Sequence, residues 1–293
     1  MYRATLSRLD RGRTYSVSLV LCGVLSVQLG AALATTLFDS LGPGGAVLAR
    51  VAFAAAVLLA LWRPTVRGLS GLQWRYVVGF GITFAGMNWA FYGALDRIPL
   101  GIAVTLEFVG PLGVAVAASR RAADVLWVAM AAAGILLLAP IPGGSIDTLG
   151  AGLALLAGCF WGAYILFSVR VGREFGGGSG LALAMAVGAA LLVPVGVVEA
   201  GAELLRPEAL AVGFAVALLS SAIPYSLELE ALRRLPQGIF GVLMSLEPAV
   251  AAAIGFAVLG QDLDAIELLA IALVVAASAG ALSTPPATAT AEA

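Results

Sequence analysis

Three ionisable side chains stand inside long apolar stretches of this sequence. Glu107 lies in "GIAVTLEFVGPLGVAVAA", Glu247 in "GVLMSLEPAVAAAIG" and Arg50 in "GAVLARVAFAAAV". A charge at the centre of a bilayer costs about 3 kcal/mol on insertion scales, so such residues typically mark a pathway or a binding site. Burial also disfavours the charged form of a carboxyl group, which suits proton binding and release. Two acids and one base in apolar segments therefore predict a site that binds a charged solute or a proton.

Each acid lies close to a proline. Pro111 follows Glu107 by four residues, so its ring disturbs the backbone carbonyl of Glu107 itself, and Pro248 follows Glu247 directly. Purely structural alternatives stay open for all three charges. In the structural alternative, Glu107 is a protonated acid that forms a hydrogen bond with a neighbouring helix. Glu247 then forms hydrogen bonds with backbone groups that the proline leaves without a partner. Arg50 fits either a carboxylate-binding group or an ion-pair partner of the acids.

Other polar and aromatic residues accompany these charges in the apolar stretches. They are Gln28 in "SVQLGAAL", Asn88 in "GMNWAFYGAL", Trp161 and Tyr164 in "FWGAYILF", and Tyr225 in "IPYSLE". We expect them to line a polar path. Interhelical hydrogen bonds and anchoring at the membrane interface are the alternative for each one.

The composition identifies the elements that must position these residues. The 293 residues are 61% hydrophobic and 11% charged, whereas a soluble domain is about 25% charged. We therefore expect an all-α integral membrane protein embedded in the lipid bilayer. The net charge of −1 gives no indication of a nucleic-acid partner.

The same composition argues against an enzyme. The sequence has no histidine and two cysteines, so metal sites and Ser/His hydrolases lack their usual residues. No nucleotide-binding "GxxxxGK[ST]" motif is present. A twin-carboxylate protease built on Glu107 and Glu247 remains an alternative, although such pairs are usually aspartates. We expect no cofactor, no metal and no catalytic residue.

Breaks at glycine, proline and charged residues divide the chain into ten apolar segments. Each is close to the 20 or so residues that cross a bilayer as a helix. The predicted spans are 16–36, 44–62, 75–95, 100–118, 124–140, 149–168, 180–199, 209–228, 238–259 and 264–282.

Arginine placement predicts the orientation, because short arginine-rich loops stay in the cytoplasm. With the N-terminus inside, only Arg97 and Arg206 of the 16 arginines fall in outer loops, and Arg50 lies within a span. We therefore expect both termini to be cytoplasmic. Residues 1–15 form a cytoplasmic segment in this scheme, and 283–293 a disordered cytoplasmic tail.

A weak internal repeat links the two halves of the chain. "RIPLGIAVTLEFVGP", from Arg97, returns 137 residues later as "RLPQGIFGVLMSLEP", from Arg234. One copy opens the fourth span and the other opens the ninth. Five spans per half is an odd number, so the halves at 16–140 and 149–282 are expected to be inverted in the membrane, as in many transporters.

The chain resembles the EamA-type transporters of the drug/metabolite transporter superfamily, and more narrowly bacterial threonine and homoserine exporters. The resemblance is carried by "GMNWAFYGALDRIPLGIAVTLEFVGPLGVAVAASRRAADVLWV", "CFWGAYILFSVRVG" and "IPYSLELEALRRLPQGIFGVLMSLEPAVAA". It implies a central cavity between the repeats, alternating access, and export across the bacterial inner membrane driven by protons. By matching blocks, it places Glu107, Asn88, Trp89, Trp161, Tyr164 and Glu247 beside that cavity.

The leading hypothesis is thus a secondary exporter of small amino acids of the threonine and homoserine type. An exporter of another metabolite, such as an aromatic amino acid or a purine, is the alternative within transport. A receptor or scaffold that transports nothing is the alternative from another class, but it has no need for paired acids within the membrane.

Overall fold

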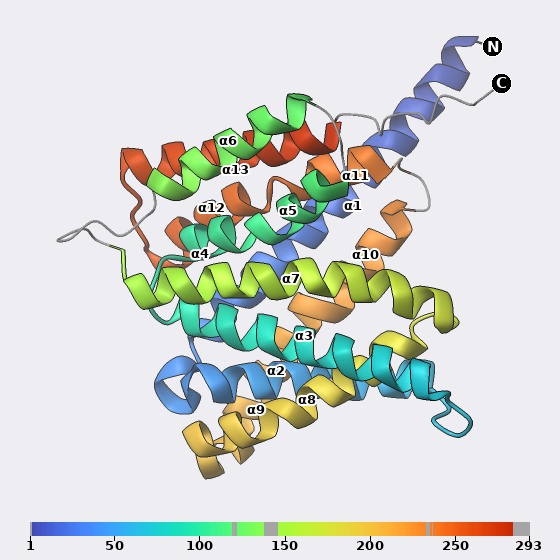
Figure 1. The fold of residues 1–293 in the computed structure, drawn as a ribbon, viewed down its shortest axis with the longest axis vertical. Coiled ribbons are helices and arrows are strands. Elements are labelled where there is room, and N and C mark those ends of the chain that lie inside the picture. Colours follow the sequence, from blue (N-terminus) through green and yellow to red (C-terminus); the bar gives the residue numbers. More distant parts are fainter. Residues whose placement is uncertain (1, 119–121, 138–145, 233–234, 236, 284–293) are drawn as a thin grey trace.

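The computed structural model describes residues 2–118, 122–137, 146–232, 235 and 237–283. All ten expected segments are helical within these residues (Figure 1). The first half contains α1 (Tyr2–Thr35), α2 (Phe38–Trp62), α3 (Gly71–Leu95), α4 (Leu100–Glu107), α5 (Val109–Ala118) and α6 (Ala122–Leu137). The second half contains α7 (Thr148–Glu174), α8 (Ser179–Ala200), η1 (Gly201–Leu205), α9 (Pro207–Ala217), η2 (Leu218–Ala222), α10 (Ile223–Leu232), α11 (Gln237–Met244), α12 (Glu247–Leu259) and α13 (Ala265–Ser283).

Within the described residues, five helical stretches are long and apolar enough to cross a membrane. They are Thr14–Thr35, Phe38–Trp62, Thr148–Glu174, Ser179–Leu205 and Val242–Leu259. Shorter apolar helices cover Leu100–Val114, Leu126–Leu137, Pro207–Ala222 and Ala265–Gly280. These stretches make the chain a multi-pass membrane protein.

The structure describes the N-terminal end of the chain but not the C-terminal end. Helix α1 begins at Tyr2 and runs without interruption into the first apolar span, so residues 2–15 are helical. The stretch before Tyr15 contains no proline that would end a helix there. Residues 284–293, the expected disordered tail, lie outside the described residues.

Two of the expected spans are interrupted in mid-course. Helix α4 ends at Glu107 and α5 begins at Val109, which leaves Phe108 between them. Helix α11 ends at Met244 and α12 begins at Glu247, which leaves a two-residue turn. The repeat places Phe108 in register with Ser245, so the two interruptions occupy equivalent positions in the two halves. We call them the first break and the second break.

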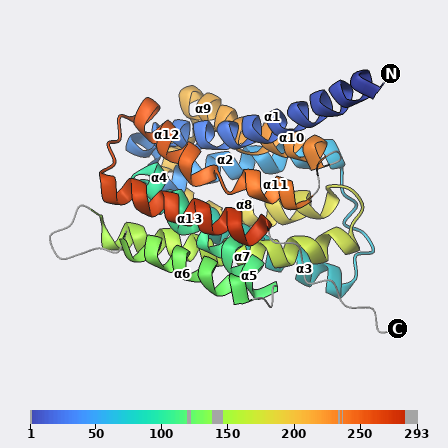
Figure 2. The same cartoon turned by 90° about the horizontal axis from the view of Figure 1, so that it is seen from above.

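The two halves are packed into each other and do not form separate bodies. Helices α3 and α7 lie along one another across the middle of Figure 1, with α6 beside α13 at the top and α2 beside α8 at the bottom. Figure 2 shows the same bundle from above. Helix α1 contacts α10, and α4 contacts α12. Each of these pairs joins one helix of the first half to one of the second.

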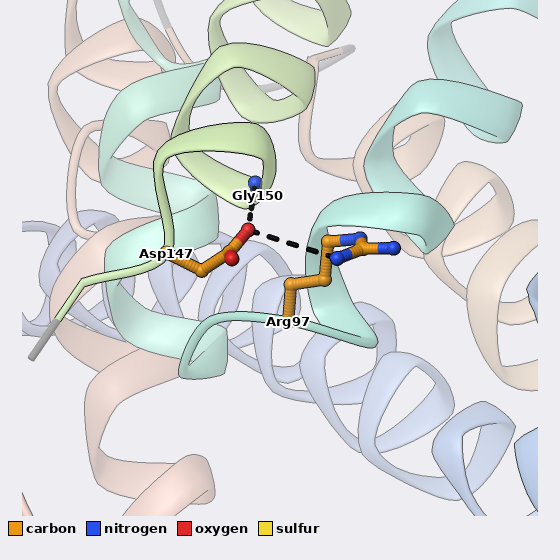
Figure 3. A network of polar contacts seen from close by, with 3 residues as sticks. All are labelled: Arg97, Asp147 and Gly150. Atoms are coloured by element: carbon orange, nitrogen blue, oxygen red, sulfur yellow. Dashed lines mark hydrogen bonds and ion pairs between the residues drawn. The ribbon is translucent and has the colours of Figure 1, made fainter.

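Polar side chains satisfy backbone groups at helix starts and join the two halves there. The Gln261 side-chain oxygen accepts a hydrogen bond from the Leu100 N–H at 2.9 Å, where α4 begins. Asp147 caps α7 by accepting from the Gly150 N–H at 2.6 Å, and the same carboxylate oxygen lies 3.9 Å from an Arg97 nitrogen (Figure 3). Four N–H groups at each helix start lack a helical partner, so such contacts fix the helix ends to one another.

Candidate functional site

A cavity of about 250 Å³ lies between the two halves, around the first and second breaks. Helices α1, α2, α3 and α4 line it from the first half, and α7, η2, α11 and α12 from the second. Its lining residues are Val27, Gln28, Ala31, Arg50, Met87, Asn88, Phe91, Val104, Glu107, Trp161, Tyr164, Ser220, Met244 and Glu247. Because both halves contribute, the cavity depends on how the halves are packed.

Arg50 is the positive charge of the cavity and is held by two neighbours. Its Nη1 donates to the Tyr92 hydroxyl at 3.4 Å, and its Nη2 donates to the Ser220 carbonyl at 3.5 Å. The guanidinium also lies 5.6 Å from the centre of the Tyr92 ring, within the range of a cation–π interaction. These contacts hold the guanidinium in place, while its Nε has no hydrogen-bond partner among the described residues.

Glu107 and Glu247 reach the cavity from the two breaks. Glu107 is the last residue of α4 and is 8% exposed, and Glu247 is the first residue of α12 and is 6% exposed. Arg50 lines the same cavity as both acids. The arrangement offers one cation and two acids to a ligand, as a site for a zwitterion requires.

Close approach of α7 keeps the first break in place. A side-chain carbon added at Gly158 would lie 2.6 Å from the Glu107 carbonyl oxygen, closer than any real Cβ contact. A side-chain carbon added at Gly110, just after the break, would likewise collide with the Gly158 carbonyl oxygen. The Trp161 ring, one turn further along α7, stacks edge to face on Phe108 at 5.4 Å between centroids. The absence of side chains at both glycines therefore lets α7 contact the interrupted backbone directly.

The remaining polar lining comes from α1 and α3. Asn88 is 2% exposed and its amide nitrogen donates to the Phe84 carbonyl at 2.9 Å, so its amide oxygen is left to accept. Gln28 is also 2% exposed, and its side-chain oxygen has no partner in the described part of the chain. Tyr164 packs on Phe80, with 4.8 Å between ring centroids. The cavity is thus polar on some walls and aromatic on others.

The structure does not bring every expected residue to this cavity. Trp89 is 42% exposed on the outer side of α3, although its neighbour Asn88 lines the cavity. Successive helical residues point about 100° apart, so two neighbours rarely share one narrow site. Tyr225 belongs to α10, but its side chain lies outside the described part of the structure.

Two polar residues of the site were not singled out by the sequence. Ser220 lies in the π-helical turn η2 and lines the cavity, and Tyr92 is fully buried beneath Arg50. The available signal for Ser220 was Pro224. Proline has no N–H for the carbonyl four residues earlier, so "SSAIP" marks a free carbonyl at Ser220. Tyr92 had no comparable signal, because a tyrosine in an apolar helix is ordinary.

The described residues contain no group of three or more His, Cys, Asp or Glu side chains able to hold a metal ion. The cavity presents hydrogen-bonding groups and charges to a ligand. Its position within a bundle of apolar helices is that of a binding site in a membrane transport protein.

Comparison with known proteins identifies the family. Residues 148–283 match the EamA-like transporter family. The threonine/homoserine exporter RhtA of Salmonella typhimurium strain LT2 is 42% identical over 270 residues, which cover 92% of this chain and 91% of that protein. The protein of the same name from Escherichia coli K12 is 41% identical over the same shares. The chain therefore belongs to the EamA-like transporter family, a family of transporters and not of enzymes.

The fold has a solved counterpart. A crystal structure of a protein 21% identical to this chain matches it with a TM-score of 0.60, over 90% of this chain and 96% of that one. At this level of identity the match concerns the fold alone.

Proposed function

We propose that this protein exports small hydroxylated amino acids, threonine and homoserine among them, across the bacterial inner membrane. The observation that carries the proposal is the identity of 42% over 92% of the chain with proteins named threonine/homoserine exporters. The charges of the cavity agree with it. Arg50 can bind the carboxylate of the substrate, and Glu247 or Glu107 can bind its ammonium group. Asn88 can form a hydrogen bond with the hydroxyl of the substrate side chain.

The size of the cavity suits a metabolite as small as an amino acid. Pockets for drug-sized ligands measure roughly 300–1,000 Å³, and this one measures about 250 Å³. The charges favour an amino acid over a purine, because every amino acid carries a carboxylate and an ammonium group. Threonine and homoserine are distinguished from an aromatic amino acid by the counterflow experiment below.

We further propose export by alternating access, coupled to protons through the acids. Ten membrane-spanning helices would form two inverted repeats, 16–140 and 149–282, with both termini in the cytoplasm. The helix contacts support two equivalent halves. In the proposed repeat, α1 corresponds to α7, α2 to α8, and α3 to the span that contains α9 and α10. The contact between α1 and α10 then corresponds to the contact between α7 and α3, and the contact between α2 and α9 to that between α8 and α3. The pairs α2–α8 and α6–α13 exchange within themselves.

Counterflow in proteoliposomes tests the substrate directly. Purified protein is reconstituted with unlabelled threonine or homoserine inside, and entry of the labelled amino acid is followed without any ion gradient. Accumulation above equilibrium is expected for both, and none for phenylalanine or adenine. Accumulation of phenylalanine or adenine in place of threonine would establish the alternative, and no counterflow with any solute would favour a non-transporting protein.

Cysteine labelling tests the proposed orientation. Cys22 and Cys159 are both exposed, so both are first replaced. Single cysteines at Asp147 and Asp262, which begin or precede helices at the proposed outer face, should react with an impermeant thiol reagent in intact cells. A cysteine at Ser119, in a proposed inner loop, should react only after lysis. The opposite labelling pattern would invert the topology.

A further inference from the structure

Ser220 is a cavity residue whose hydroxyl has no hydrogen-bond partner among the described residues. Its side chain is 4% exposed, and its Oγ forms no hydrogen bond within the described residues. The Nε of Arg50 is in the same situation, as is the side-chain oxygen of Gln28. A buried polar atom without a partner costs about 1–3 kcal/mol. Such atoms around one cavity indicate a ligand that completes their hydrogen bonds.

The backbone at Ser220 is shaped by its own sequence. Pro224 has no N–H to donate to the Ser220 carbonyl, and the chain forms the π-helical turn Leu218–Ala222 at this point. The carbonyl is instead bonded by the Arg50 Nη2 at 3.5 Å. π-Helical turns occur frequently at functional sites. Here the turn joins the backbone of Ser220 to the cation of the cavity.

Helix α1 holds this turn from the other side. The Ser26 hydroxyl donates to the Leu219 carbonyl at 2.7 Å. Gly30, one turn further along α1, leaves the space that the Ser220 Oγ occupies, since a Cβ at Gly30 would collide with that oxygen. The Ser220 Oγ therefore lies against Gly30 of α1, in contacts that do not use its hydrogen-bonding capacity, and Ser220 is one of the residues that line the cavity.

We propose that the Ser220 hydroxyl is a second donor to the substrate carboxylate, beside Arg50, and so determines specificity for free amino acids. This inference rests on the proposed function. Donor chemistry decides which end of the substrate is bound. Arg50 has only donors, and the Ser220 hydroxyl can donate, whereas the Gln28 oxygen only accepts. A carboxylate needs donors, and an ammonium group needs acceptors such as Gln28, Glu107 or Glu247.

Ser221 provides a matched control in the same turn. It is 3% exposed, and its Oγ also lacks a partner in the described part of the chain. Its side chain, however, lines a separate small void of about 10 Å³ with residues of α2 and α9. Replacing Ser221 by alanine removes the same atom from the same turn without touching the cavity.

The test uses counterflow of labelled threonine at a concentration far below half-saturation, with three unlabelled competitors: threonine, 2-aminobutyrate and threonine amide. 2-Aminobutyrate keeps the carboxylate and lacks the side-chain hydroxyl, whereas threonine amide keeps the hydroxyl and lacks the carboxylate. In Ser220→Ala, the concentrations of threonine and of 2-aminobutyrate needed for half-inhibition should both rise by about tenfold, as expected for losing a hydrogen bond to a charged group. The value for threonine amide should not change, and Ser221→Ala should behave as wild type.

Each other result has a defined meaning. Weaker binding of threonine with unchanged 2-aminobutyrate would assign Ser220 to the side-chain hydroxyl and overturn the inference. An equal loss for all three competitors, or in Ser221→Ala, would make the role structural and also overturn it. Wild-type counterflow of another α-amino acid in place of threonine would refute the proposed substrate alone, and the comparison is then made with that amino acid and its amide. No counterflow of any amino acid would refute both proposals.

Discussion

The first and second breaks occupy equivalent positions in the two halves, yet they place their acids at opposite helix ends. Glu107 is the last residue of α4, and Glu247 is the first residue of α12. The repeat aligns Glu107 with Met244 and Glu247 with Gly110, so neither acid has an acidic counterpart. The halves therefore share a backbone interruption but differ in where they carry charge.

This difference has an electrostatic consequence. The N-terminal end of a helix carries a partial positive charge, and the C-terminal end a partial negative charge. The carboxylate of Glu247 lies at the positive end of α12, whereas that of Glu107 lies at the negative end of α4. We infer a division of roles in which Glu247 binds the substrate ammonium and Glu107 exchanges a proton. Two equivalent interruptions thereby place two acids in different electrostatic surroundings.

The largest expected effect comes from Glu107→Gln, which keeps the shape of the side chain but cannot ionise. Proton-driven export should fall to background, because the proton site is lost, while counterflow without a gradient should persist. Both are measured in the same proteoliposomes, with and without an imposed pH gradient, after the protein is shown to be folded and inserted. Wild-type export with an unchanged pH dependence would make Glu107 a structural acid and remove the proposed division.

Glu247→Gln should give a different pattern. If Glu247 binds the ammonium group, its loss should weaken substrate binding by roughly 10- to 100-fold, the effect of a hydrogen bond to a charged group. Half-saturation in counterflow and in gradient-driven export should rise together, while the pH dependence stays that of wild type. An effect on pH dependence alone would mean that the two acids have exchanged their proposed roles.

The sequence predicted the helical segments and most of the residues that the structure brings together around one cavity. Apolar length and charge predicted the helical segments, but the predicted spans 100–118 and 238–259 were continuous, and the structure interrupts both, close to Pro111 and Pro248. Seven of the nine proposed residues line one cavity: Gln28, Arg50, Asn88, Glu107, Trp161, Tyr164 and Glu247. Trp89 does not, because a motif in one-letter code does not specify which side of the helix each neighbour faces.

Contacts between distant segments could not be predicted in the same way. Gly30 leaves the space for the Ser220 side chain, and Gly158 allows α7 to contact the backbone at the first break. Each glycine is far in the sequence from the segment that it contacts. In a chain rich in alanine and glycine, a pair such as Gly158 and Gly162 is a weak signal for close packing. Which glycine matters depends on the partner helix, which only the three-dimensional packing defines.

Gly158→Ala should produce a moderate effect at the first break alone. The added carbon would lie 2.6 Å from the Glu107 carbonyl oxygen, so α7 must shift, at a cost of about 1–3 kcal/mol for such overpacking. Thermal unfolding of the purified protein in detergent should therefore occur at a lower temperature. Gly152, on the same helix with nothing within 4 Å of an added carbon, is the matched control.

Gly152→Ala should leave the unfolding temperature unchanged or raise it, because alanine favours a helix interior by roughly 0.5–1 kcal/mol over glycine. Opposite signs for the two substitutions would support direct backbone contact at the first break. A similar shift for both would indicate that only helix propensity is being measured.

The smallest expected effect concerns Arg97, which the repeat pairs with Arg234. Its nitrogen lies 3.9 Å from Asp147, and the two side chains are 41% and 43% exposed, so the ion pair should contribute at most about 1 kcal/mol. Arg97→Ala should thus change the unfolding temperature and the half-saturation very little.

Asp147 allows the ion pair to be separated from the helix cap. Asp147→Ala removes the acceptor of the Gly150 N–H as well as the charge, and losing a cap costs about 0.5–2 kcal/mol. Asp147→Asn keeps the cap, since asparagine caps helices as well as aspartate does, and loses only the charge. We expect the unfolding temperature to fall for Asp147→Ala and to stay close to wild type for Asp147→Asn and Arg97→Ala. If all three variants are destabilised equally, the ion pair and not the cap fixes α7 beside the start of α4, and the repeated arginine then has a structural role that its exposure does not indicate.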